Sequence, residues 1–220
     1  MKKIISILLA LCLIAGLSAC SGGSSGEAAE EGAGSAETEE QGTGSASAEE
    51  QTEAPASNDS GSGDETLVVY FSVTGNTKAV AEKIASITGA DIYEIKAAQE
   101  YTDGDIDWND SDSRTTHEQN DKTARPEIGS DKVSLDGYKT IYIGYPIWWG
   151  EEPRIMDTFV ESYDFDGITM IPFCTSGSSG IGRSGQNLAD NAGSGNWLEG
   201  ERFSGSASED ELRSWIEGLQ

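Results

Sequence analysis

The protein has 220 residues, and 14 Lys and Arg stand against 39 Asp and Glu, which leaves a formal charge of -25. This charge argues against a nucleic-acid partner or an anionic membrane surface, because both need basic side chains. With His117 as the one histidine, a His-ligated metal cluster is excluded and a Ser-His-Asp triad has a single candidate base. Two of the three cysteines, Cys12 and Cys20, lie near the N-terminus, so no disulfide framework is expected. The composition predicts neither metal ligands nor a catalytic nucleophile.

Residues 1–20 have the pattern of a secretory signal. Two lysines precede an apolar run over residues 4–17, which is too short for a membrane span with ordinary flanks. The segment ends in Leu-Ser-Ala-Cys and resembles a bacterial lipoprotein signal, which is cleaved before a cysteine that becomes lipidated. An ordinary cleaved signal peptide is the alternative. Cys20 favours the lipoprotein signal, so we expect an extracytoplasmic protein that is attached to the membrane only through lipid at Cys20.

Residues 21–63 have the composition of a spacer. They contain no Leu, Ile, Val, Met, Phe, Tyr or Trp, so they cannot bury a core. The segment carries acids and no base, and such a chain repels itself and extends. We therefore expect a disordered acidic tether of Gly, Ser, Ala and Glu, which lifts residues 64–220 off the membrane.

Residues 64–220 are long enough for one compact domain, and strand and helix patterns alternate along them. The apolar run at residues 67–71 predicts a buried parallel strand, and an amphipathic helix follows and ends before Gly89. Alternating strands and helices predict a parallel sheet. Further strands are expected at residues 91–95, 140–145 and 168–173, and a weaker fifth strand is expected at residues 197–203, where Gly200 interrupts it. One further helix is expected after Pro153, with an apolar stripe that extends to Tyr163, and a last helix is expected after Ser208.

The turn after the first strand has the side chains of a phosphate site. Residues 72–77 contain three hydroxyls, an asparagine and a glycine, and no acid, where a helix begins. Unpaired N–H groups at a helix N-terminus attract anions, and Gly75 lets the backbone approach a ligand. An ordinary capped helix is the alternative, because Ser and Thr are favoured at caps. The spacing matches neither a Walker motif nor a dinucleotide fingerprint, so we expect a single terminal phosphate.

The turn after the third strand contains two adjacent tryptophans, Trp148 and Trp149. Both cannot bury in one core direction, so at least one is expected to face a loop or cleft. The pair either plugs the end of the strand or forms a wall for a flat aromatic ligand, with Pro146 and Gly150 fixing the turn. If the sheet is doubly wound with the order 2-1-3-4-5, strands one and three are neighbours where the order reverses and ligands bind there, which would favour the wall.

These segments together resemble the flavodoxin-like family, in particular a lipoprotein-associated bacterial branch. The resemblance rests on VVYFSVTGNTKAVAEKIA, DIYEI, GYPIWWGEEP and IPFCTSGSSGIGRS, and it covers nearly all of residues 64–220. It implies a three-layer, doubly wound α/β fold, with a five-stranded parallel sheet of order 2-1-3-4-5 and FMN as the cofactor. The implied FMN contacts are Ser72, Thr74, Gly75, Asn76 and Thr77 at the phosphate, Pro146, Ile147, Trp148, Trp149 and Gly150 beside the ring, and Thr175, Ser176, Gly177, Ser178 and Gly180 at the ring edge.

Residues 96–139 are too long for a bare connection between two strands. A short helix is expected over residues 114–122. Trp108 and His117 either reach the flavin or a substrate, or they belong to a packed cover with solvated charges, and the cover is the simpler expectation. Glu151 and Glu152 would lower the flavin potential if they faced the ring.

The resemblance and the signal together indicate electron transfer outside the cytoplasm, between the flavin and a redox partner protein. The first alternative is an FMN-dependent NAD(P)H or quinone oxidoreductase, in which Arg154 or Arg183 would hold a nicotinamide phosphate. The second alternative is a binding lipoprotein without cofactor, because a fold alone does not determine function.

Overall fold

A computed structural model describes residues 65–219 of the protein. The predicted signal at residues 1–20, with Cys20, and the predicted tether at residues 21–63 lie outside the described residues. Within residues 65–219, no helix is long and apolar enough to cross a membrane.

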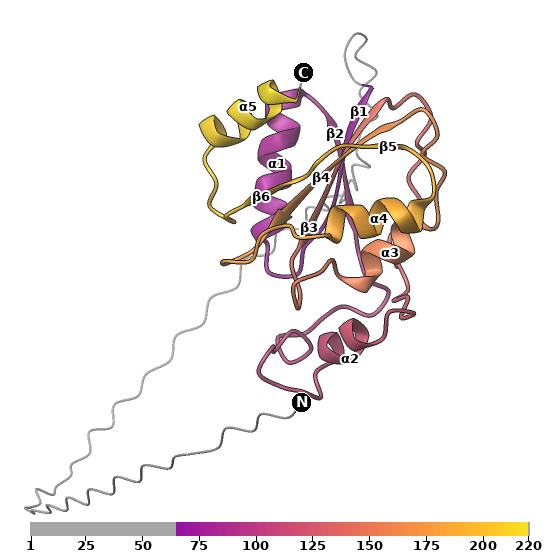
Figure 1. Ribbon diagram of the computed structural model, residues 1–220, viewed down its shortest axis with the longest axis vertical. Coiled ribbons are helices and arrows are strands. Elements are labelled where there is room, and N and C mark those ends of the chain that lie inside the picture. Colours follow the sequence, from indigo (N-terminus) through magenta and orange to yellow (C-terminus); the bar gives the residue numbers. More distant parts are fainter. Residues whose placement is uncertain (1–64, 220) are drawn as a thin grey trace, which may run out of the picture. The chain divides into compact units, whose positions relative to one another are not determined.

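The strands form one parallel sheet of order β2-β1-β3-β4-β5, which is the predicted order, and β6 also pairs with β4 (Figure 1). Residues 197–203 were expected to form one interrupted fifth strand, and the structure has two short pieces at this place. The strands are β1 (Thr66–Phe71), β2 (Asp91–Ile95), β3 (Thr140–Pro146), β4 (Thr169–Thr175), β5 (Asn196–Trp197) and β6 (Glu201–Phe203).

Gly200 separates these two pieces because the chain there lies against β4. A Cβ atom at Gly200 would lie 2.6 Å from the carbonyl oxygen of Pro172 and 2.9 Å from its Cβ. Pro172 has no N–H to donate, and proline inside a sheet is accommodated where the ladder is interrupted. The break between β5 and β6 therefore lies where Gly200 approaches Pro172, which has no N–H for a ladder hydrogen bond.

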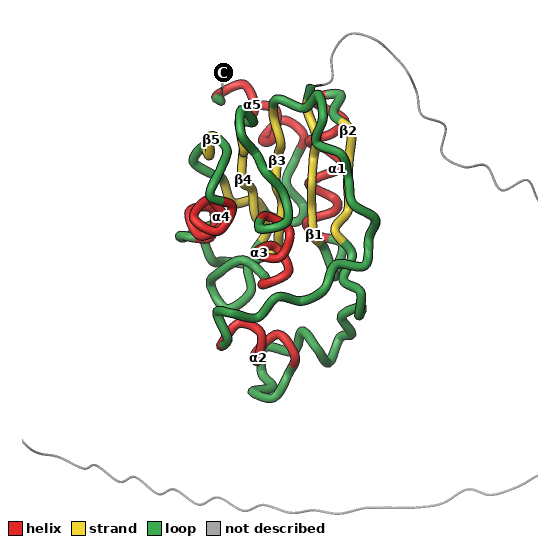
Figure 2. Tube along the Cα trace, turned by 90° about the vertical axis from the view of Figure 1, so that its right-hand side faces the viewer, coloured by secondary structure: helices red, strands yellow, loops and turns green. Residues whose placement is uncertain are grey.

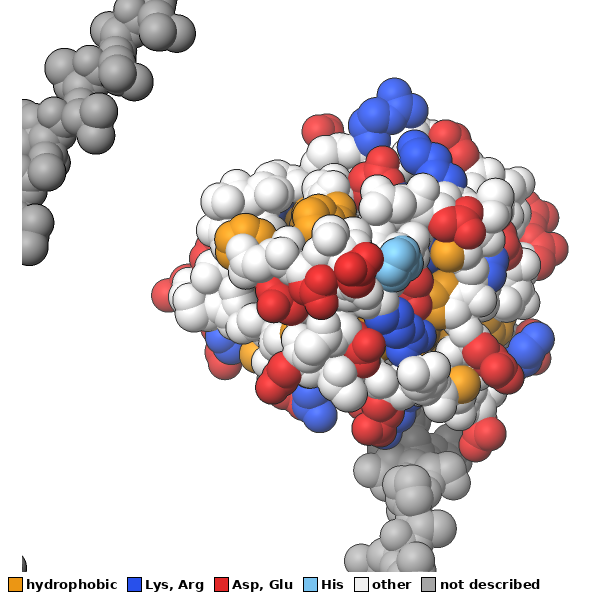
Figure 3. Space-filling view, turned by 90° about the horizontal axis from the view of Figure 1, so that it is seen from below, with side chains coloured by type: hydrophobic (Ala, Val, Ile, Leu, Met, Phe, Trp, Pro, Cys, Tyr) orange, Lys and Arg blue, Asp and Glu red, His pale blue; other side chains and the backbone are white. Residues whose placement is uncertain are grey.

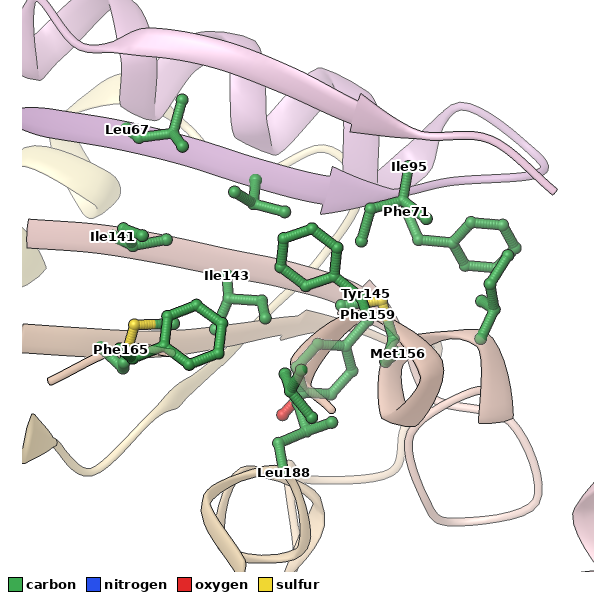
Figure 4. Close-up of a cluster of buried hydrophobic side chains, with 14 of the residues drawn as sticks. Leu67, Phe71, Ile95, Ile141, Ile143, Tyr145, Met156, Phe159, Phe165 and Leu188 are labelled. Atoms are coloured by element: carbon green, nitrogen blue, oxygen red, sulfur yellow. The ribbon is translucent and has the colours of Figure 1, made fainter. Parts of the chain in front are cut away.

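Helices cover both faces of the sheet, as a doubly wound fold requires (Figures 1 and 2). α1 and α5 pack on the face that carries Val68 and Tyr70 of β1, and α3 and α4 pack on the face that carries Leu67 and Phe71 (Figure 4). Alternate residues of a strand point to opposite faces, so burial on both sides explains the continuous apolar runs. The helices are α1 (Asn76–Thr88), α2 (Arg114–Asn120), α3 (Arg154–Val160), α4 (Ser184–Ala192) and α5 (Glu209–Gly218).

Local signals set the helix ends. Gly89 caps α1 in the left-handed conformation with φ 73°, and the side chain of Ser208 accepts the N–H of Glu211 at 3.2 Å at the start of α5. α3 begins after Pro153 as predicted but ends at Val160, so the expected stripe residue Tyr163 lies beyond it. Tyr163 still packs on the helix, with its ring centroid 4.7 Å from that of Phe159.

Residues 96–139 form the insertion, and the part of it that carries α2 lies at the carboxyl ends of the strands (Figure 2). Tyr101 anchors it there, because the Tyr101 ring packs edge-on against Phe71 at 5.8 Å and against Trp148 at 5.2 Å. Trp108 is 73% exposed, and the His117 side chain is exposed beside Asp112. Figure 3, which views this end of the domain, shows acidic and apolar side chains side by side on the surface. The insertion is thus a packed cover, in which Trp108 and His117 are exposed and the ion pair of Arg114 with Glu118 is largely buried.

Candidate functional site

The first loop presents an uncapped helix N-terminus. Gly75 is the N-cap residue of α1, it has φ 83°, and no side chain caps the helix. The alternative of an ordinary capped helix is therefore wrong. Asn76 donates its amide to the hydroxyl of Thr74 at 3.0 Å, and both side chains are exposed. The N–H groups of the first turn consequently remain ready for an anion, and no acid stands in that turn.

The three hydroxyls of this loop have different surroundings. Thr74 is exposed, whereas Thr77 is buried and shares a hydrogen bond of 2.8 Å with the hydroxyl of Thr175 in β4. The hydroxyl of Ser72 is buried and has no hydrogen-bond partner in the described part of the chain. Thr77 therefore ties the first loop to the third, and Ser72 retains an unsatisfied hydroxyl.

The second loop is a two-residue turn. The N–H of Trp148 donates to the carbonyl of Glu151 at 3.0 Å, and the N–H of Glu151 donates back at 3.0 Å. Trp149 has φ 54° and Gly150 has φ 86°, and positive φ at both central residues defines a type I′ turn. Tryptophan is a strained choice for such a position, and strain of this kind is concentrated at functional sites.

The two tryptophans are not equivalent. Trp148 packs edge-on against Phe71, with ring centroids 5.5 Å apart, and against Tyr101. Trp149 lies at the tip of the turn and is 49% exposed. Trp148 thus belongs partly to the aromatic packing below the loop, whereas the Trp149 side chain is largely in solvent.

The third loop follows β4 and is held from two sides. The N–H of Ile147 in the second loop donates to the carbonyl of Thr175 at 3.0 Å. Arg202 of β6 donates to the hydroxyl of Ser176 at 3.1 Å, to the carbonyl of Ser176 at 2.5 Å and to that of Gly177 at 3.0 Å. These bonds make the loop an ordered wall, which was not evident from its small polar residues.

The three loops meet around one cavity of about 510 Å³, a volume within the range of small-molecule sites. Eight of the predicted residues line it: Thr74, Asn76, Pro146, Ile147, Trp148, Thr175, Ser176 and Gly177. The other predicted residues do not line it: Ser72, Gly75, Thr77, Trp149, Gly150, Ser178 and Gly180. Ser72 instead lines a neighbouring cavity of about 320 Å³, together with Phe71 and Tyr101.

A fourth segment, which sequence reasoning missed, completes the cavity. Ser204, Gly205 and Ser206 line it from the turn after β6. A Cβ atom at Gly205 would clash with the side chain of Asn76, so glycine permits this close approach. The sequence held a signal, because a run of Ser and Gly follows the fifth strand and the carboxyl ends of parallel strands share one edge of a sheet.

An ionic network lies under the second loop. Arg154, which is 4% exposed, donates to Glu151 at 2.7 Å and to Glu152 at 3.4 Å, and it also lies 3.5 Å from Asp157. Burial raises the pKa of Glu152 to about 7 and also raises the pKa of Asp157, whereas the hydrogen bond from Arg154 lowers the pKa of Glu151.

This network corrects two expectations from the sequence. The Glu152 carboxylate accepts from Asn187 of α4 at 3.2 Å and points into the interior, so it does not face the cavity. Arg154 is occupied inside the protein, because it also donates to the carbonyl of Gln119 at 3.2 Å. It is therefore not available to hold a nicotinamide phosphate. No ionisable side chain is among the residues that line the cavity.

Comparison with known proteins agrees with this architecture. A family model described as flavodoxin matches residues 65–219. A proposed flavoprotein from Bacteroides uniformis is 45% identical, with a TM-score of 0.67, over 71% of this chain and 99% of that one. A proposed flavoprotein from Bacteroides eggerthii is 43% identical, with a TM-score of 0.66, over 70% of this chain and 96% of that one.

A flavoprotein from Lactobacillus acidophilus, solved in complex with FMN, is 26% identical over 69% of this chain and 97% of that one, with a TM-score of 0.49. No functionally curated protein matches this chain. The family match spans the whole described domain, and the sheet order and the switch-point cavity agree with it. The chain belongs to the flavodoxin family.

Proposed function

We propose that this domain binds FMN in the cavity where its loops meet and passes electrons to or from another protein. The observation that carries the proposal is the cavity itself, which lies at the reversal point of the sheet order. The free N–H groups of α1 and the Thr74 hydroxyl suit the phosphate, and the apolar wall of Pro146, Ile147 and Trp148 suits the ring. Bound FMN would supply the redox chemistry, and the chain would orient it and limit access of water.

A titration of the apoprotein with FMN and with riboflavin tests this proposal. Each charge-assisted hydrogen bond to the phosphate contributes about 1.5 to 3 kcal/mol, so FMN is expected to bind at least about 100-fold more tightly than riboflavin. The visible absorbance of the purified protein is the first observation to make. Equal affinity for both compounds would contradict a phosphate site, and a colourless protein that FMN does not saturate would favour the binding lipoprotein without cofactor.

We further propose that the domain works outside the cytoplasm, tethered by residues 21–63 to lipid on Cys20. The support is the signal pattern and the charge, since residues 64–220 carry 12 basic and 29 acidic side chains, or -17. A field of this sign repels anionic NADPH and steers a basic redox protein toward the domain. Outside the cytoplasm, cytosolic nicotinamide pools are also out of reach.

One observation favours the alternative of an FMN-dependent NAD(P)H or quinone reductase. The second cavity, of about 320 Å³, is formed with Tyr101 of the insertion and lies beside the first loop. Anaerobic stopped-flow mixing of the FMN-loaded protein with NADH and with NADPH separates the two functions. We expect slow or no bleaching of the flavin with either nucleotide and full bleaching with dithionite. Bleaching at many turnovers per second would establish the reductase instead.

A further inference from the structure

Arg202 stands out among the basic side chains near the cavity. It lies in β6 beside Cys174 of β4, and its guanidinium crosses over to the third loop. Among residues 65–219, no carboxylate lies within ion-pair distance of this guanidinium, although the domain is strongly acidic. Its hydrogen bonds go instead to the backbone carbonyls of Ser176 and Gly177 and to the Ser176 hydroxyl. The charge of Arg202 is therefore directed at the loop.

The two hydrogen bonds from Arg202 to the carbonyls of Ser176 and Gly177 determine the direction of the N–H groups that follow them in the loop. In a planar trans peptide, the carbonyl and the N–H of the next residue point in opposite directions. Because the carbonyls of Ser176 and Gly177 point at Arg202, the N–H groups of Gly177 and Ser178 point away from it. Gly177 lines the cavity and Ser178 follows it directly, and within the described chain neither the Gly177 N–H nor the Ser178 N–H has a hydrogen-bond acceptor. Two successive free donors of this kind form a site for an electron-rich atom.

We propose that Arg202 is a positioning residue that holds the Gly177 and Ser178 N–H groups toward the flavin edge where negative charge collects on reduction. This inference rests on the proposed binding of FMN. Donors that are oriented in advance stabilise developing charge without reorganisation, and a cation behind them polarises the peptides further. Arg202 thereby favours binding of reduced FMN over oxidised FMN in a domain whose other charges oppose it.

Three variants separate the positioning role from the effect of charge alone. Arg202→Gln removes both the charge and the guanidinium donors. Arg202→Lys keeps the charge but lacks the planar guanidinium that donates to all three acceptors. Arg213→Gln is the matched control, because Arg213 is exposed on α5 and its loss changes the net charge equally. The dissociation constants of oxidised and reduced FMN are measured for each variant, together with the midpoint potential.

We expect Arg202→Gln and Arg202→Lys to weaken the binding of reduced FMN about tenfold relative to the binding of oxidised FMN. This change lowers the two-electron potential of the bound flavin by about 30 mV. Arg213→Gln should leave this ratio within about twofold of the wild type. The inference is overturned if Arg202→Lys behaves as the wild type, or if Arg202→Gln and Arg213→Gln shift the potential equally, since either result would mean that only charge matters.

A measurement on the apoprotein keeps the inference separate from FMN binding. The backbone order parameters of Gly177 and Ser178 are expected near about 0.8 in the wild type and in Arg213→Gln, and below about 0.6 in Arg202→Gln. If the wild type binds no FMN but this loss of order occurs, the proposed function fails and the hold of Arg202 on the loop stands. Unchanged order in Arg202→Gln would overturn the positioning role, whether or not FMN binds.

Discussion

Thr74 and Thr77 belong to one loop, yet their hydroxyls have opposite roles. The hydroxyl of Thr77 is paired with that of Thr175 in the interior, whereas Thr74 is exposed and lines the cavity. Thr77→Val leaves the Thr175 hydroxyl buried and unpaired, so the free energy of unfolding should fall by about 1 to 3 kcal/mol. Thr74→Ala should change it by less than about 0.5 kcal/mol. Denaturant unfolding of the two apoproteins measures both values.

FMN titration of the same pair supplies the complementary result. Thr74→Ala removes a donor to the proposed phosphate and should weaken FMN by about one to two decades, with little effect on riboflavin. If Thr77→Val instead caused the larger loss of FMN affinity in a fully folded protein, the assignment of Thr77 to the interior would be wrong.

Trp149 should destabilise the fold through its backbone conformation. Its φ of 54° is strained for a side chain with a Cβ, and glycine adopts it freely. Trp149→Gly is therefore expected to raise the free energy of unfolding by roughly 1 kcal/mol relative to Trp149→Ala, which retains the strain. Equal stability of the two variants in thermal unfolding would show that the turn is unstrained.

At the scale of elements, the ionic network joins the insertion, α3 and α4. Arg154 of α3 reaches Gln119 of α2, and Asn187 of α4 donates to Glu152. Each of these residues is unremarkable in sequence, since a charged residue near a helix start is usually solvated. Only the packing of three separate segments removes water from this place, so the sequence carried no signal for it.

The network predicts a dependence of stability on pH. Burial raises the pKa of Glu152 from 4.5 to about 7. Between pH 4.5 and about 7, the folded protein therefore binds a proton at Glu152 that the unfolded chain has released. Stability then falls as pH rises through this window, and the loss is complete above pH 7. Glu152→Gln has no carboxyl to deprotonate, so its free energy of unfolding should not fall in this window. The difference in free energy of unfolding between Glu152→Gln and the wild type should therefore grow between pH 5 and 8 by on the order of 2 to 3 kcal/mol.

Glu161→Gln is the control for this prediction. Glu161 is hydrogen-bonded by Arg125 at 2.6 Å, which lowers the pKa of its carboxyl. The stability that Glu161 contributes is present above its unfolded pKa of 4.5 and is lost as pH falls below it, so the difference between Glu161→Gln and the wild type should stay level between pH 5 and 8. Parallel pH profiles of urea unfolding for the two variants would rule out a protonated Glu152.

At the scale of the whole molecule, lipid on Cys20 should anchor the protein to the membrane, and the FMN site should not depend on this anchor. Cys20→Ala should release the protein from the membrane fraction, because no other lipidation site is expected, while the soluble protein should keep its FMN spectrum. Retention of Cys20→Ala in the membrane fraction at wild-type level would refute the anchor. Fractionation followed by absorbance spectroscopy of both fractions tests both parts.

Charge should govern how the whole domain meets its partner. With -17 on residues 64–220, the rate of electron transfer to a basic haem protein should fall steeply as salt rises from about 10 to 500 mM. An acidic acceptor of similar potential serves as the control, and its rate should rise or stay level. A salt-independent rate with the basic acceptor would argue against electrostatic steering.

The sequence by itself determined the order of the strands in the sheet and most of the helices, but it predicted no helix between the fourth and fifth strands, where α4 lies. Continuous apolar runs such as residues 67–71 identify strands buried on both faces, and Gly89 and Ser208 mark helix ends through local backbone preferences. The first two loops could also be located, since parallel strands bring their carboxyl ends to one edge.

Only the tertiary structure decided which loop residues face the cavity. It assigned Thr77 to the interior and brought in Ser204 to Ser206, and it placed Arg202 behind the third loop. It also separated the packed Trp148 from the exposed Trp149. These outcomes depend on contacts between segments far apart in the chain, and local propensity and periodicity carry no information about such contacts, because each residue type fits several surroundings equally well.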